Sequence, residues 1–184
     1  MDYKTKPISR DTLRELSTII RNKIFHCTKK YFFDVISALE ELPLIGNDVS
    51  VEIVADNDGE LKGVPCTTTL DPSNKYVIKI KESVYDGAYF KKNGGYRMHI
   101  MHEICHYLLF SIGFKPYFYR TYRNNELKFY ESIEWQAKAL AGEILIPYEE
   151  TKGLSESQIM KKCKVSKEAA QKRIKLDKKE MSQC

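Results

Sequence analysis

The chain has 184 residues and 42% hydrophobic content, which is enough to fill the core of one domain with a small appendage. No stretch approaches twenty apolar residues and residues 1–10 are charged, so we expect no membrane-spanning helix, no secretory signal and a cytoplasmic location. The five cysteines are scattered without Cys-x-x-Cys spacing, which argues against a disulfide framework and against a cysteine-zinc module.

Two amphipathic helices, or one long bent helix, are predicted at the start of the chain. Residues 9–25 place leucines and isoleucines at helical spacing, with Ser9 as the cap. Residues 31–42 repeat the pattern before Pro43 stops it. These helices are interpreted as scaffold that packs on a sheet.

A β-rich span follows the helices. Strands are expected at about residues 49–53, 66–70 and 76–80, separated by turns, and they should form a small three-stranded, mostly antiparallel sheet. The strand at 76–80 is a candidate exposed edge along which a peptide could add, although an ordinary edge strand fits equally well. Residues 82–96 are interpreted as a loop that can contain a helical turn and that leads into the next helix.

That next helix, residues 98–110, carries the clearest chemical signal. His102, Glu103 and His106 have the spacing H-E-x-x-H, which projects both imidazoles from one helix face toward a single metal ion. Apolar residues cover most of the remaining circumference, so the helix should run through the core, where a polar stripe needs metal or hydrogen bonds. His99 extends this stripe, and a structural histidine is the simpler interpretation of it.

Two histidines do not complete a catalytic zinc site, which usually has three protein ligands and leaves a fourth position for water. The helix predicted over residues 129–145 offers three acidic candidates, Glu131, Glu134 and Glu143. Glu134 is the best placed, because it precedes small residues that would let this helix pack closely on the metal helix. Glu131 stays open as a competitor, or as a hydrogen-bond partner of a ligand histidine.

Two motifs together carry a family pattern. The first is Arg97-x-x-x-x-His102-Glu103-x-x-His106, and the second is Glu134-x-x-Ala137-x-x-Leu140-Ala141-x-x-Ile144-Leu145-Ile146-Pro147. They resemble the ImmA/IrrE family of zinc metallopeptidases, although Lys138 and Leu140 replace the Asn and Phe that are usual there. The resemblance implies that His102, His106 and Glu134 bind one zinc ion that carries a water, and that Glu103 is the catalytic base.

With this resemblance the expected fold class is α+β. Residues 1–150 should form a compact zincin-like metallopeptidase domain with N-terminal helices, a small three-stranded sheet, the HExxH helix and the glutamate helix. An aromatic and basic run at residues 117–123 is interpreted as a loop on the active-site side, with nucleic-acid stacking as the alternative.

The C-terminal segment, residues 151–184, differs from the rest of the chain in its charge. It carries ten lysines and arginines against four acidic residues, and the rest of the chain is nearly neutral. Ser155-x-x-Gln158 is a capping box that opens a short helix, and a second helix is expected over residues 166–179. We expect a basic helix-turn-helix-like hairpin packed on the first domain, whose charge would permit weak contact with DNA.

The predicted function is zinc-dependent hydrolysis of peptide bonds in a protein substrate. The resembling family is linked to mobile elements and stress responses, which implies that the substrate is a helix-turn-helix repressor whose cleavage releases transcription. Two alternatives stay open, namely a DNA-binding regulator and a binding module with a structural zinc site. Neither the oxyanion-stabilising residue nor the oligomeric state follows from the sequence.

Overall fold

The computed structural model describes residues 2–117 and 127–181, and its architecture is α+β as expected. The sheet contains β1 (Val49–Val54), β2 (Cys66–Leu70) and β3 (Tyr76–Lys81). The helices are α1 (Arg10–Ile19), α2 (Val35–Ile45), α3 (Glu82–Tyr89), α4 (Gly94–Ser111), α5 (Ile133–Leu145), α6 (Tyr148–Thr151), α7 (Glu156–Cys163) and α8 (Lys167–Met181). A π-helical turn (Ile20–Ile24) extends α1, and a 3-10 turn (Phe129–Glu131) precedes α5. Residues 118–123 of the predicted aromatic and basic loop lie outside the described residues.

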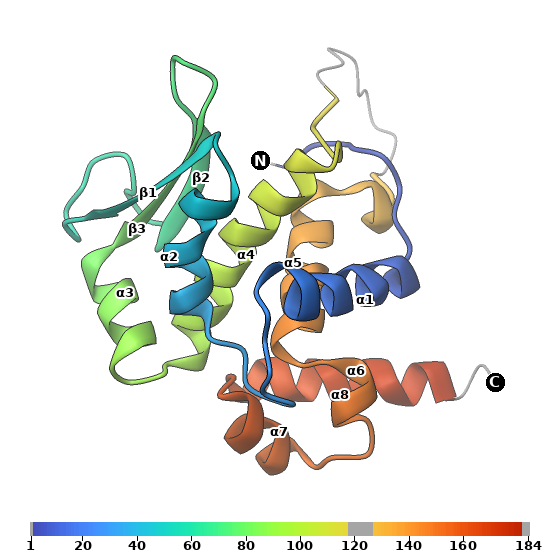
Figure 1. The fold of residues 1–184 in the computed structure, drawn as a ribbon. Coiled ribbons are helices and arrows are strands. Elements are labelled where there is room, and N and C mark those ends of the chain that lie inside the picture. The colour runs from blue at the N-terminus through green and yellow to red at the C-terminus, as the bar shows by residue number, and fades with distance from the viewer. Residues whose placement is uncertain (1, 118–126, 182–184) are drawn as a thin grey trace.

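The H-E-x-x-H helix, α4, lies at the centre of the molecule (Figure 1). On one side it packs against β2, β3, α2 and α3, and on the other against α5. Its apolar side chains Ile100, Met101, Ile104 and Cys105 are fully buried. The prediction of a helix running through the core is therefore confirmed, because apolar residues on several faces require neighbours on several sides.

The three expected strands are confirmed, but their order changes the interpretation of one of them. β3 lies between β1, which runs parallel to it, and β2, which runs antiparallel. The prediction that residues 76–80 form an exposed edge is therefore wrong. The order of the strands depends on contacts between residues distant in sequence, which the local pattern does not show. Ile78 and Ile80 are fully buried, as expected for side chains of a central strand. The edge strand beside α4 is β2.

The helix boundaries differ from the sequence expectation in three places. The Ser9 cap of α1 is confirmed, since its hydroxyl accepts the Thr12 N–H. α2 starts only at Val35, because Asp34 caps it, and it continues past Pro43, which sits in the last turn. Residues 82–89, expected to be loop with at most a helical turn, form α3, a helix too short to show a clear hydrophobic period. α4 already begins at Gly94, with Asn93 as its cap.

The predicted C-terminal hairpin is present as α7 and α8. Ser155 and Gln158 form the expected capping box, and Lys164 ends α7 in the left-handed conformation, with φ of 54°. Arg97 of α4, which is 1% exposed, donates to the carbonyls of Cys163 and Lys164. Since these carbonyls close the end of α7, the buried guanidinium fixes the hairpin to the centre of the molecule. Burial lowers the pKa of Arg97 to about 10.

The N-terminal residues form a short extended segment against the start of α5. Thr5 N–H donates to the Glu131 carbonyl, and Ile8 N–H donates to the Tyr130 carbonyl. Asp2 accepts from the Ser132 hydroxyl at 2.5 Å. This segment holds the beginning of α5, where Glu134 lies, in a defined position.

Within the described ranges, no helix is both long enough and apolar enough to span a bilayer.

Candidate metal centre

Three predicted ligands from two helices meet at one point. His102 and His106 lie one turn apart on the face of α4 that packs on α5, and Glu134 lies in the first turn of α5. The two Nε2 atoms are 3.0 Å apart. Glu134 Oε2 is 3.2 Å from Nε2 of His102, and Oε1 is 3.4 Å from Nε2 of His106. These side chains form the group of potential metal ligands found among the described residues.

The spacing of these atoms fits a tetrahedral ion. Zinc bonds to imidazole nitrogen and carboxylate oxygen are about 2.0–2.1 Å long, so two ligand atoms of a tetrahedral site lie about 3.3 Å apart. All three separations are close to this length. The donor set found among the described residues, two imidazoles and one carboxylate, is one that catalytic zinc sites use.

Glu134 is held by its cap and by the ligand histidines. Ser132, the N-cap of α5, accepts the Trp135 N–H, and Asp2 lies 3.3 Å from the Glu134 N–H. Hydrogen bonds from His102 and His106 hold the pKa of the Glu134 carboxyl well below its ordinary value. The Glu134 side chain is 50% exposed, so the group opens to solvent on that side.

Glu103 lies beside the ligand group but outside it. Its Oε2 accepts a hydrogen bond of 2.8 Å from the Thr68 hydroxyl on β2. Burial raises the pKa of the Glu103 carboxyl above its ordinary value, while His102 and Thr68 act in the opposite direction. Thr68 had no sequence signal, because only the pairing of β2 beside α4 brings it to Glu103.

The other acidic candidates of the glutamate helix are engaged elsewhere. Glu131 pairs with Lys4 at 3.1 Å and is not part of the ligand group. Glu143 is fully buried between three arginines, Arg10, Arg14 and Arg173. The geometry thus favours Glu134 over Glu131, which sequence spacing alone left open.

His99 lies on the exposed surface of α4, one turn before His102. Partial burial of its ring lowers the pKa of His99, and the neighbouring His102 and Lys138 act in the same direction. His99 is not part of the ligand group.

Comparison with known proteins finds a similarity in the region that contains this centre. No curated protein and no solved structure matches the chain. Residues 91–175 match the family model described as Peptidase_M78, IrrE N-terminal-like domain. The matched region contains α4, α5, α6 and α7 and extends into α8. Residues 91–175 are thus similar to the IrrE N-terminal-like domain of the Peptidase_M78 family, a family of metallopeptidases, in agreement with the H-E-x-x-H and glutamate motifs that lie within this region.

Proposed function

We propose that this protein is a zinc-dependent endopeptidase in which His102, His106 and Glu134 hold the ion. The observation that carries the proposal is the convergence of these three side chains at the separations of a tetrahedral site. A structural zinc site is closed by four protein ligands, whereas the group found among the described residues supplies three. When bound, zinc would lower the pKa of a water toward neutrality and polarise the scissile carbonyl.

Glu103 would act as the general base. Its carboxylate lies next to His102 in sequence but outside the ligand group, so it is available for proton transfer. The Thr68 hydroxyl occupies Oε2, which leaves Oε1 to accept a proton from the attacking water and to deliver it to the leaving amine. Thr68 therefore acts as a positioning residue that sets the direction of the accepting oxygen.

The edge of β2 offers a place for the substrate backbone. Within the described residues, β2 pairs with β3 and with no other strand. Backbone hydrogen bonds join Asp71 to Lys75 and Pro65 to Lys81, so every second residue between Pro65 and Asp71 directs its backbone N–H and C=O toward β3. Thr68, whose side-chain hydroxyl contacts Glu103, consequently turns its backbone N–H and C=O away from β3. An extended peptide that adds to this edge would lie beside the base, which is the role that sequence analysis assigned to β3.

The substrate we propose is a helix-turn-helix transcriptional repressor of a mobile element or a stress response. The support is the family resemblance together with the peptidase domain, which implies a protein substrate. A cytoplasmic location belongs to this proposal, because such repressors act on intracellular DNA.

Metal analysis and cleavage assays test the proposal together. Wild-type protein should contain one zinc per chain and should cut the repressor encoded beside its gene. Glu103→Gln should keep the zinc and lose cleavage, whereas Glu134→Ala should lose both. Salt-dependent binding of duplex DNA by zinc-loaded protein that cuts no repressor would instead favour the DNA-binding regulator. A Glu103→Gln variant that cuts at the wild-type rate would remove Glu103 as the base.

A further inference from the structure

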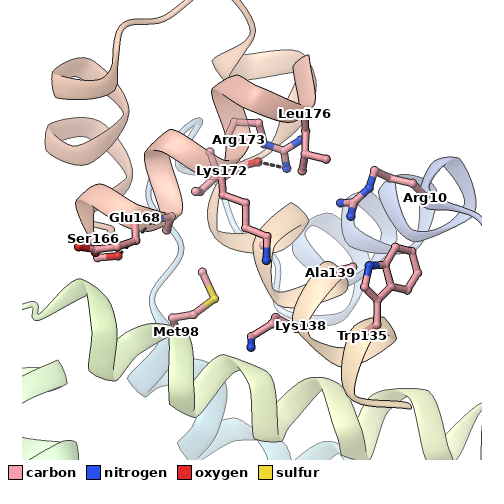
Figure 2. Close-up of a pocket in the computed structure, with 13 residues that line it drawn as sticks. Arg10, Met98, Trp135, Lys138, Ala139, Ser166, Glu168, Lys172, Arg173 and Leu176 are labelled. Carbon is pink, nitrogen blue, oxygen red and sulfur yellow. Dashed lines mark hydrogen bonds between the residues drawn. The ribbon is translucent and has the colours of Figure 1, made fainter. Parts of the chain in front are cut away.

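A cavity of about 240 Å³ lies between α5 and α8 (Figure 2). Its apolar lining comes from α4, α5, α8 and the segment after α5, and consists of Met98, Ala139, Gly142, Ile146, Ala169 and Leu176. Met98 precedes His102 by one turn of α4, and Lys138 follows Glu134 by one turn of α5. The cavity therefore borders the contact between α4 and α5, the two helices that carry the ligand group.

Cationic side chains from three helices converge on this cavity. Figure 2 shows Lys138 of α5, Lys172 of α8 and Arg10 of α1 with their charged ends directed into the same space. Burial lowers the pKa of Lys172, and the nearby charges of Lys138 and Arg10 lower it further. The two lysines and the arginine are therefore close enough to repel one another.

Two of the four cationic side chains that line the cavity lack an acidic partner in the described part of the chain. Arg10 and Arg173 pair with the buried Glu143, but neither Lys138 nor Lys172 forms an ion pair within the described part of the chain. The one acidic residue of the lining, Glu168, lies at the opposite end beside Ser166 (Figure 2). Both lysines are exposed to solvent, and a bound anion would offset the repulsion between their charges.

The size and the walls of the cavity define the ligand further. Pockets for drug-sized ligands measure about 300–1,000 Å³, so this cavity suits a smaller molecule. Trp135 forms one wall, with the Arg10 guanidinium carbon 5.3 Å from its ring centroid, and offers an apolar surface next to the cations.

We propose that this cavity binds a small phosphorylated molecule, with the phosphate between Lys138, Lys172 and Arg10 and the apolar part against Trp135. A phosphate monoester carries a charge of about −1.5 to −2 at pH 7, which matches two unpaired lysines better than a single carboxylate does. This ligand site is distinct from the peptidase centre, and its existence does not depend on the proposed function. A ligand held there would touch α5 one turn from Glu134 and so could bias the position of that carboxylate.

Trp135 is the single tryptophan of the chain, so intrinsic fluorescence reports directly on the cavity. Zinc-loaded full-length protein should be titrated with inorganic phosphate, with a nucleoside monophosphate and with the matching nucleoside, at constant ionic strength set by chloride. We expect a saturable fluorescence change with both phosphate compounds and a weaker or absent change with the nucleoside. Calorimetry should give the same dissociation constants, and it detects binding even where the indole does not respond.

Charge-removing variants connect the signal to the cavity. Lys138→Gln and Lys172→Gln should each weaken phosphate binding by about tenfold or more, because each removes a charge-assisted hydrogen bond. Lys178→Gln is the matched control, since Lys178 is exposed on the same helix and does not line the cavity. Absence of saturable binding by both methods in the millimolar range would overturn the proposal. Binding of a glutamate-containing peptide but of no phosphate compound would also overturn it, and would make the cavity a substrate subsite.

Discussion

Thr68 on the edge strand β2 donates its hydroxyl to Oε2 of Glu103 on α4 over 2.8 Å. The two residues are 35 positions apart, and their contact joins the strand that can receive a peptide to the carboxylate proposed as base. Because the hydroxyl engages one carboxylate oxygen, it selects which oxygen faces the reacting water.

Thr68→Val should therefore slow catalysis without removing the metal. We expect kcat to fall by about 10–100-fold, the range typical of hydrogen-bond partners around a metal centre, with KM and zinc content little changed. Steady-state cleavage of a peptide substrate and metal analysis measure the two effects. Thr68→Ser should restore most of the rate, and Thr69→Val should behave as wild type because Thr69 is exposed. Equal loss in Thr68→Val and Thr68→Ser would contradict the role of the hydroxyl.

Removal of the metal should lower thermal stability, because the proposed ligands join α4 to α5. A ligand that binds only the folded state at 1,000 times its dissociation constant contributes about 4 kcal/mol. We expect a chelator to lower the melting temperature of wild-type protein and to leave that of Glu134→Ala unchanged. Differential scanning calorimetry with and without the chelator makes the comparison. Glu131→Ala is the control and should respond like wild type, since its carboxylate pairs with Lys4.

Sequence reasoning found the parts of this centre that are local in the chain. The H-E-x-x-H spacing and the apolar residues around it define both the helix and the direction of His102 and His106. Glu134 could be preferred over Glu131 only weakly, because spacing does not show that Glu131 turns toward Lys4.

The parts that sequence reasoning missed depend on contacts between distant segments. Thr68 belongs to a threonine-rich strand with no feature that singles out its third residue, and Asp2 reaches α5 only because the N-terminal segment folds back on it. The central position of β3 has the same origin, since hydrophobic pattern gives the strands but not their order. α3 was expected at most as a helical turn within a loop, because eight residues give too few turns for a period to appear.

Glu143 should be among the most sensitive positions for stability. Its carboxylate is fully buried, with Arg10 at 2.9 Å, Arg173 at 2.6 Å and Arg14 at 3.6 Å. Removal of one member of a buried ion pair leaves an uncompensated charge, so Glu143→Gln should lose about 3–5 kcal/mol of the free energy of unfolding. Urea denaturation at pH 7 measures the loss. Glu149→Gln, on the surface beside Lys152, should show no measurable change, and a similarly small effect for Glu143→Gln would contradict this assignment.

Gly94, the first residue of α4, should tolerate no side chain because the turn between α7 and α8 lies against it. A Cβ at this position would lie 2.4 Å from both the Ser166 nitrogen and the Val165 carbonyl carbon. These are backbone atoms, so Gly94→Ala should displace the hairpin and cost about 1–3 kcal/mol in urea denaturation. Gly142→Ala is the matched control, since its Cβ meets no atom within 4 Å inside α5 and alanine should add up to about 1 kcal/mol there. Equal stability of the two alanine variants would show that the hairpin does not press on the start of α4.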